Sequence, residues 1–261
     1  MSDAIDLGLD SIFTEAPRPP SPEATFSTYK GADKEFKIRL VGSHPLWGHH
    51  LWNSALSVAS YLEKHSHFYQ NKNVLELGAG GALPSLVAAA SGARKVVITD
   101  YPDPDLIQNI EYNVKVNVAE TEKEQVAVQG YIWGHSVEPL LALLNAPPSS
   151  ASEENKFDLI ILSDLIFNHS QHDSLLKTCN LALRTSSSAV GVKPCVWVFY
   201  THHRPHLAHR DMEFFVKAKA QGWDSTHCII LTQKFAPMFP EDPGEEEVRA
   251  SVHGWILTRN T

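Results

Sequence analysis

Two glycines and one aspartate at fixed spacing mark the first place in the chain where chemistry could occur. Residues 71–105 read NKNVLELGAGGALPSLVAAASGARKVVITDYPDPD, in which a short apolar run enters a glycine cluster and a second apolar run ends in Asp100. Gly78 and Gly80 suit a tight strand-to-helix turn, because glycine lets the main chain approach a ligand without a Cβ clash. Asp100 lies twenty residues after Gly80, where its carboxylate could accept hydrogen bonds from ribose hydroxyls. The pattern predicts a site for a cofactor that carries a ribose.

Two further positions favour S-adenosylmethionine (AdoMet) over NAD. The third glycine of G-x-G-x-x-G, which lets a helix pack close beneath a pyrophosphate, would fall at position 83, but the chain has Leu83 there, followed by Pro84. Glu76 enters the turn two residues before Gly78. A carboxylate is a poor neighbour for pyrophosphate and a good one for the ammonium and sulfonium of AdoMet. A dinucleotide site and a purely structural turn are the alternatives.

The elements that must position these residues alternate between strands and helices. Strands are expected at 36–41, 74–77, 96–99, 124–133, 157–164, 195–205 (with an exit loop), 226–233 and 252–259, and helices within 46–65, 83–90, 102–117, 134–144, 169–184 and 209–220. The near-continuous apolar run FDLIILSD indicates a strand buried on both faces, as in a parallel sheet. We therefore predict a doubly wound, mostly parallel seven-stranded α/β sheet that ends in a hairpin-like pair of strands with no helix between them.

Length and composition indicate one large domain of an ordinary globular protein. The 261 residues are 43% apolar and 20% charged. Residues 1–35 carry four prolines and little periodicity, so we expect a Pro-rich arm, partly disordered or docked as a lid, followed by a single catalytic domain over 36–261. No apolar run approaches the ~20 residues needed to span a membrane.

Charge and cysteine content limit the compartment and the partners. A net charge of −8 argues against nucleic acid as the main partner, and an acidic enzyme can steer a basic protein toward itself. The three cysteines, Cys179, Cys195 and Cys228, are far apart and odd in number, which suits a reducing, cytoplasmic setting. The acidic N-terminus does not resemble a secretory signal or a transit peptide. We expect a monomer with no membrane partner.

The segment SDLIFN, which follows the fourth core strand, is the candidate acceptor site. Asp164 could hydrogen-bond an amine, and Phe167 could pack against its methylene stem or its charge. The reference pKa is ~10.4 for lysine and ~7.7–8.0 for an α-amine, and an apolar pocket favours the neutral form of either. A helix cap or a surface carboxylate is the plain alternative for Asp164. The N/D-P-P-Y/F motif of nucleic-acid amine methyltransferases is missing, which argues against nucleobases.

Read in order, the motifs VLELGAGGALPS, ITDYPD, YIWG, SDLIFNHSQHDSLL and FYTHHRP resemble those of the seven-β-strand (class I) protein methyltransferases. Among these the chain is most similar to the fungal enzymes that methylate the N-terminus and adjacent lysine of translation elongation factor 1-alpha. The resemblance covers roughly residues 25–261. It implies a Rossmann-like fold, AdoMet as cofactor, and that elongation factor as the protein partner.

The resemblance also implies roles for particular residues. It gives cofactor contacts to Trp52, Gly78, Ala79, Gly80, Asp100, Trp133 and Ser163. One departure is visible: the family motif E-L-G-x-G-x-G reads E-L-G-A-G-G-A here, with Ala82 in the last glycine position, where we expect little effect. Trp52 and Trp133 could instead be plain core residues, and Ser163 only a hydroxyl at a strand end.

Four histidines in THHRPHLAHRD, at positions 202, 203, 206 and 209, superficially suggest a metal site. Pro205 interrupts a helix there and neither a cysteine nor a carboxylate completes a ligand set, so we expect no metal and favour a substrate-side loop or local hydrogen bonding. Three functions stay open beside the leading one: a methyltransferase of another protein lysine, a nucleotide-dependent oxidoreductase, and a non-catalytic interaction protein on the same fold.

Overall fold

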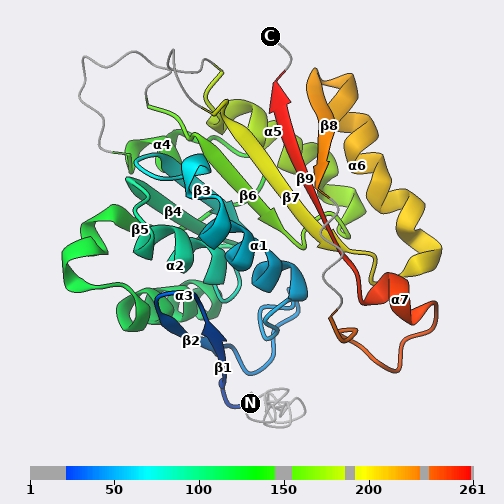
Figure 1. Cartoon of the computed structure of the whole chain (residues 1–261), viewed down its shortest axis with the longest axis horizontal. Coiled ribbons are helices and arrows are strands. Elements are labelled where there is room, and N and C mark those ends of the chain that lie inside the picture. Colours follow the sequence, from blue (N-terminus) through cyan, green and yellow to red (C-terminus); the bar gives the residue numbers. More distant parts are fainter. Residues whose placement is uncertain (1–21, 145–154, 186–191, 230–234, 260–261) are drawn as a thin grey trace, which may run out of the picture.

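The computed structural model describes residues 22–144, 155–185, 192–229 and 235–259. A seven-stranded sheet with the order β5-β4-β3-β6-β7-β9-β8 forms its centre, and a separate two-stranded sheet pairs β1 with β2 (Figure 1). The strands are β1 Thr25–Lys30, β2 Glu35–Leu40, β3 Asn73–Leu77, β4 Lys95–Asp100, β5 Val126–Gly130, β6 Leu159–Ser163, β7 Cys195–Thr201, β8 Trp223–Ile229 and β9 Val252–Arg259. The helices are α1 Asn53–Lys64, α2 Leu83–Ala90, α3 Pro104–Asn117, α4 Glu138–Ala142, α5 His172–Ala182, α6 Ala208–Ala220 and α7 Glu246–Arg249.

The direction of the strands confirms the predicted mostly parallel, doubly wound sheet. Neighbouring strands from β5 to β7 run parallel, and β9 is antiparallel to both of its neighbours, β7 and β8. The expectation of two final strands with no helix between them was wrong in one detail, because the short helix α7 lies in that connection. Strand β8 also starts earlier than expected, at Trp223 instead of residue 226.

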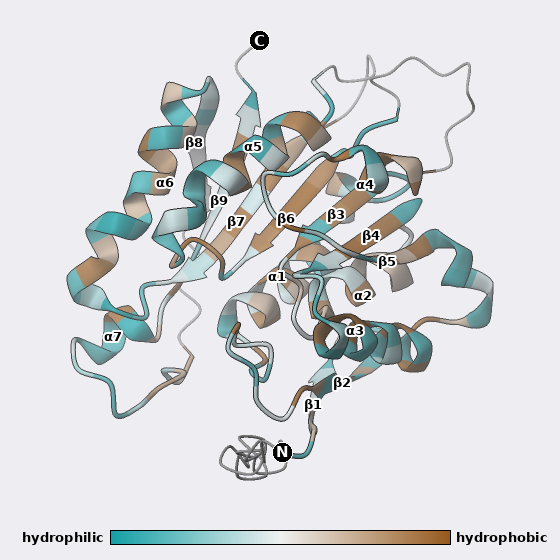
Figure 2. Cartoon of the chain, turned by 180° about the vertical axis from the view of Figure 1, so that it is seen from behind, coloured by the Kyte–Doolittle hydropathy of each residue, from teal (hydrophilic) through white to brown (hydrophobic). Residues whose placement is uncertain are grey.

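Helices cover both faces of the sheet, and alternate residues of β3 enter the two resulting cores. Val74 packs in a cluster that includes Leu62 of α1 and Leu86 of α2. Its neighbour Leu75 packs in a second cluster on the other face, with residues of α4, α5 and α6. The central strands are accordingly the most hydrophobic part of the ribbon (Figure 2). Burial on both faces explains why these strands read as continuous apolar runs.

Three asparagines along α3 hold the β1–β2 hairpin. Asn113 accepts the Arg39 N–H through Oδ1 and donates to the Arg39 carbonyl through Nδ2. Asn117 repeats both bonds with Lys37, and Asn109 donates to the Arg39 carbonyl as well. Side-chain amides at four-residue spacing on one helix face thus satisfy the outer edge of β2.

The β1–β2 hairpin gives regular structure to part of the segment that we expected to be an irregular arm. Residues 25–30 form a regular strand inside the segment expected to be irregular, and the arm up to residue 21 lies outside the described residues. Cys179 and Cys195 are free and buried. Every described helix is too short or too polar to reach across a lipid bilayer.

Candidate functional site

A cavity of about 560 Å³ opens where the carboxyl ends of β3, β4 and β6 meet. Ligands of open α/β sheets bind at this edge. All of the candidate site residues named from the sequence line it: Trp52, Glu76, Gly78, Ala79, Gly80, Asp100, Trp133, Ser163, Asp164 and Phe167. Their individual roles stay predictions, but the structure brings them together around one space.

Three residues of the glycine turn, Gly78, Gly80 and Ala82, lie in the left-handed region of backbone space. Gly78 has a φ of 60°, and a Cβ there would lie 2.7 Å from Leu165 Cδ2 and 3.1 Å from Trp133 Cζ2. Gly80 has a φ of 54°, and a Cβ there would meet no atom within 4 Å. The first glycine therefore permits close packing, whereas the second leaves free space beside the main chain that a ligand can fill.

Glu76 supplies the N-terminal cap that α2 lacks. The helix begins after Ala82, whose side chain cannot accept a hydrogen bond. Glu76 Oε2 instead accepts the Ser85 N–H at 3.0 Å. Glu76 is 1% exposed, and burial raises the pKa of its carboxyl to about 8 against the opposing effect of the Ser85 hydrogen bonds. Such a carboxyl is protonated at neutral pH until a cation arrives, which suits the ammonium or sulfonium of a ligand.

Asp100 binds the turn as well as facing the cavity. Its Oδ2 accepts the Gly80 N–H at 2.8 Å, and its Oδ1 accepts the Tyr101 N–H at 2.7 Å. Burial raises the pKa of Asp100, and these two N–H groups oppose the rise. A carboxylate has about four acceptor positions, so two remain for hydroxyl groups of a ligand.

Asp164 lines the cavity, and only one oxygen of its carboxylate has a hydrogen-bond partner among the described residues. Its φ is 57°, an unusual value for a residue with a side chain. Oδ1 lies 3.0 Å from His203 Nε2 and accepts the Thr201 N–H at 3.3 Å. Oδ2 is buried and no described residue bonds it, and the same holds for Ser163 Oγ beside it. Asp164 is therefore no helix cap, and its free oxygen points to a ligand.

Aromatic rings surround the acceptor end of the cavity. Trp52 stacks at 6.4 Å and 29° on Phe167 and meets His203 edge-on at 5.1 Å. Phe239, from the connection between β8 and β9, packs edge-on against Trp47 at 5.8 Å and Trp52 at 6.0 Å. Trp52 thus packs against the candidate acceptor residue Phe167, and Phe239 belongs to a segment that the sequence analysis did not single out.

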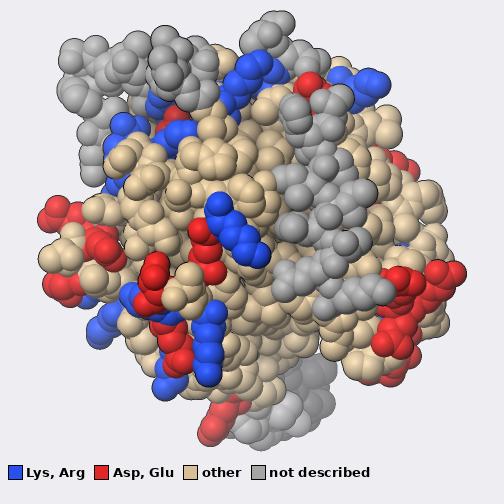
Figure 3. Space-filling model, in the orientation of Figure 1, with Lys and Arg blue, Asp and Glu red and all other residues tan. Residues whose placement is uncertain are grey.

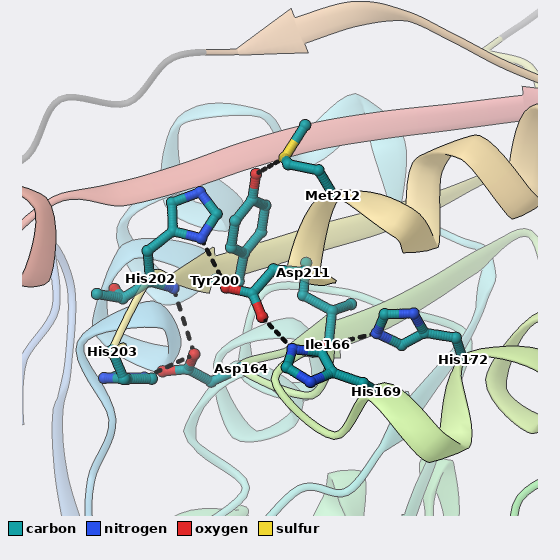
Figure 4. Close-up of polar contacts among 10 residues, drawn as sticks. Asp164, Ile166, His169, His172, Tyr200, His202, His203, Asp211 and Met212 are labelled. Carbon is teal, nitrogen blue, oxygen red and sulfur yellow. Dashed lines mark hydrogen bonds and ion pairs between the residues drawn. The ribbon is translucent and has the colours of Figure 1, made fainter. Parts of the chain in front are cut away.

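The THHRP loop is held by carboxylates, as Figure 4 shows. His202 Nδ1 and His169 Nε2 each lie 2.6 Å from a different oxygen of Asp211, a residue of α6. The sequence analysis did not pair these carboxylates with the histidines, although Asp211 ends the THHRPHLAHRD segment itself, nine residues after His202. Among the described residues, no three histidine, cysteine or acidic side chains group as metal ligands. The loop is a hydrogen-bonded part of the acceptor side.

Large apolar side chains are exposed around the rim of the cavity. Leu46, Trp47, Tyr101, Ile132 and Phe167 are each at least 39% exposed and line it. Apart from Phe167, none was named from the sequence. Leu46 and Trp47 lie in the segment HPLWGHH, shortly before Trp52. Tyr101 follows Asp100, and Ile132 precedes Trp133. Closeness in sequence to a predicted site residue was therefore the only indication that these side chains would line the cavity.

A Rossmann-like sheet whose carboxyl edge holds a glycine turn, a buried acid and a group of aromatic rings is typical of the class I AdoMet-dependent methyltransferases. The family model described as lysine methyltransferase matches residues 32–221. The chain belongs to this family. Its relatives include proteins named Protein N-terminal and lysine N-methyltransferase EFM7 from Cryptococcus neoformans (44% identity, 97% of this chain and 89% of the relative), Schizosaccharomyces pombe (45%, 93% and 91%) and Candida albicans (43%, 97% and 97%).

Solved structures support the fold. A protein of Pyrococcus horikoshii assigned as an RNA methyltransferase aligns with a TM-score of 0.53 at 14% identity, over 84% of this chain and 90% of that one. A second solved structure, of a protein assigned as a methyltransferase in complex with SAH, aligns with a TM-score of 0.54 at 12% identity, over 93% of this chain and 57% of that one. These similarities concern the architecture.

The residues present fit AdoMet. The space beside Gly80, the two remaining acceptor positions of Asp100 and the unpartnered Ser163 hydroxyl together offer contacts for a bulky ligand with hydroxyl and cationic groups. When bound, the cofactor supplies an electrophilic methyl group on a sulfonium. The protein's part is then to hold an acceptor in line with that methyl group.

Proposed function

We propose that this methyltransferase modifies the N-terminal α-amine and the adjacent lysine of translation elongation factor 1-alpha, acting as a cytoplasmic monomer. The observation that carries the proposal is the buried, unpartnered Oδ2 of Asp164, which lines the cavity together with the Trp52 and Phe167 rings. An amine offers what this oxygen lacks, a hydrogen-bond donor. The names of the relatives supply the kinds of amine, and the family resemblance supplies the substrate.

Surface charge supports a protein acceptor. The net charge is −8, and acidic side chains gather at the edge of the molecule where α7 lies (Figure 3). This edge includes the segment EDPGEEE at 241–247. The segment begins two residues after Phe239, whose ring packs against Trp52 of the cavity. An acidic surface beside the acceptor end favours approach of a basic protein and disfavours nucleic acid.

The side chains of the acceptor site act on the amine in two ways: they orient it, and they exclude water from it. Asp164 accepts an N–H of the amine and fixes its orientation, and Trp52 and Phe167 pack against the carbon chain and keep water out. The amine must lose a proton before it can attack. This costs lysine roughly 3–4 kcal/mol more than an α-amine near neutral pH. The α-amine should therefore react at lower pH than the lysine.

The test is direct. Purified enzyme, labelled AdoMet and unmodified elongation factor are incubated, and the methyl groups are mapped by fragmentation mass spectrometry. Methylation at the first residue and the next lysine is expected, and an acetyl-blocked N-terminus should lose the first signal. Methyl groups at internal lysines alone would replace the proposal by that of another protein lysine methyltransferase. AdoMet binding without transfer to any cell protein would indicate a non-catalytic role.

A further inference from the structure

His203 contacts Asp164 but is not among the residues that line the cavity. Its Nε2 lies 3.0 Å from Asp164 Oδ1, and the Thr201 N–H approaches the same oxygen at 3.3 Å. Both partners therefore act on Oδ1. Oδ2 is left without a described partner in a carboxylate whose side chain is 1% exposed. The imidazole and the Thr201 N–H thus occupy one oxygen of Asp164 and leave the other unbonded.

The position of the imidazole is fixed from several sides. The His203 ring lies 5.1 Å from the Trp52 ring and 6.4 Å from the Phe239 ring, measured between centroids. Its neighbour His202 is tied to Asp211, so the loop cannot shift without breaking that bond (Figure 4). The short distance to Asp164 is therefore a stable feature of the site.

The charges around His203 favour its cationic form. Burial lowers the pKa of His203, but Asp164, Asp211 and Asp242 outweigh it, and the net pKa is raised. These three carboxylates reach the ring from the end of β6, from α6 and from the segment before α7. Asp164 therefore faces the cavity as one half of an ion pair, with its negative charge compensated from behind.

This compensation matters because an amine acceptor has conflicting needs. A bare buried carboxylate would bind the amine, but it would bind the ammonium form best and raise the amine's pKa. An ammonium has no lone pair with which to attack a methyl group. A carboxylate that is already paired with a cation still accepts a hydrogen bond, yet it stabilises the ammonium much less.

We propose that His203 is a positioning residue that holds Asp164 by one oxygen and neutralises it, so that the other oxygen orients the acceptor amine in its neutral, nucleophilic form. The inference rests on the proposed transfer to a protein amine. The ammonium proton leaves to water before the reaction. The nitrogen lone pair then forms the N–CH3 bond as the S–CH3 bond breaks, and the electrons of that bond stay on sulfur.

His203→Gln tests the charge separately from the hydrogen bond, because the glutamine amide can still donate to Oδ1. In this variant the KM for a peptide with a free α-amine followed by lysine should fall, as the ammonium binds better. At pH 7 kcat should fall about tenfold and the pH optimum should rise by about one unit, since one unit in the bound amine's pKa changes its neutral fraction tenfold. His206→Gln, at an exposed position three residues further along, should leave the optimum unchanged.

A second measurement needs no turnover. Histidine ring protons of the complex with S-adenosylhomocysteine are titrated by NMR, with His203→Gln used for assignment. The His203 signal should titrate above the usual histidine range, and Asp164→Asn should move it down. A His203 that titrates at or below that range, or a glutamine variant with raised KM and an unchanged optimum, would overturn the proposal. If the peptide is not methylated at all, the NMR result still stands, and the proposed function is what fails.

Discussion

The N–H of Gly80 donates to Asp100 Oδ2 at 2.8 Å, so the last residue of β4 holds the turn that follows β3. The Tyr101 N–H occupies the other oxygen of the same carboxylate. Asp100 therefore shapes the main chain of the turn, and we predict that its remaining acceptor positions bind the ribose of the cofactor. A substitution there should damage both.

Asp100→Asn should weaken AdoMet binding by about 1.5–3 kcal/mol, or roughly tenfold to a hundredfold, because an amide nitrogen would face one of the two N–H donors. Isothermal calorimetry gives the affinity, and circular dichroism checks that the fold is kept. Asp105→Asn, on the exposed first turn of α3, is the matched control and should bind normally. Equal affinities for the two variants would remove Asp100 from the site.

Gly78→Ala and Gly80→Ala should separate packing from ligand contact. Both residues have positive φ, so both variants bear backbone strain of roughly 1–2 kcal/mol. Only the Gly78 variant adds a clash, with Leu165 Cδ2 at 2.7 Å, and its Tm should fall further. The Gly80 variant places a methyl group in open cavity space and should lose more AdoMet affinity than stability. The reverse order would contradict the assignment of the two glycines.

Glu76→Gln should make the cofactor-free protein more stable at alkaline pH. The folded-state pKa of about 8 is raised from 4.5, so the free energy of unfolding falls as pH rises through this interval, because the folded state holds a proton that the unfolded state has lost. Glutamine cannot ionise, and its oxygen can still accept the Ser85 N–H. At pH 9 the variant's Tm should exceed that of the wild type by roughly 2–4 °C for each kcal/mol recovered.

At pH 5 the two proteins should melt at nearly the same temperature. AdoMet binding by the variant should be weaker, since a neutral amide does not attract a cation. Equal Tm differences at both pH values would show that Glu76 does not titrate in this interval.

Phe239→Leu should raise the KM for the protein acceptor about threefold to tenfold and leave AdoMet affinity unchanged. The ring packs against Trp47 and Trp52, which line the acceptor end, and an aromatic contact of this kind contributes roughly 0.5–1.5 kcal/mol beyond its buried area. Phe26→Leu, an exposed ring on the β1–β2 hairpin, is the control for losing an aromatic side chain. A kcat effect with constant KM would argue against a role in acceptor binding.

Much of the site could be predicted because the carboxyl ends of parallel strands lie along one edge of the sheet. Glu76, Asp100 and Ser163 come from three different strands, but each stands at a carboxyl end, and these ends meet at one edge of the sheet. Local spacing along the chain was therefore enough to place them in a common cavity. Apolar runs likewise predicted the core strands, since burial on both faces leaves a clear pattern in sequence.

The parts that were missed depend on contacts between distant segments. Phe239 reaches Trp52 from a connection without periodicity, and Asp211 of α6 meets His169, which lies 42 residues earlier in the chain. In the sequence, the asparagines of α3 resemble ordinary polar residues of a helix. Their bonds to β2 are visible only in the folded structure. Tertiary hydrogen bonding of this kind has no signature in the spacing of one segment.

Asp164 carries a cost in folding that a replacement could remove. Its backbone adopts a conformation that glycine or asparagine takes more readily, and one of its buried oxygens has no described partner. A laboratory evolution experiment that selects only for heat resistance should therefore accumulate changes at this position. If Asp164 has the proposed role, the resulting heat-stable proteins should lose methyltransferase activity. Selection for thermal stability therefore has to be combined with selection for methyltransferase activity.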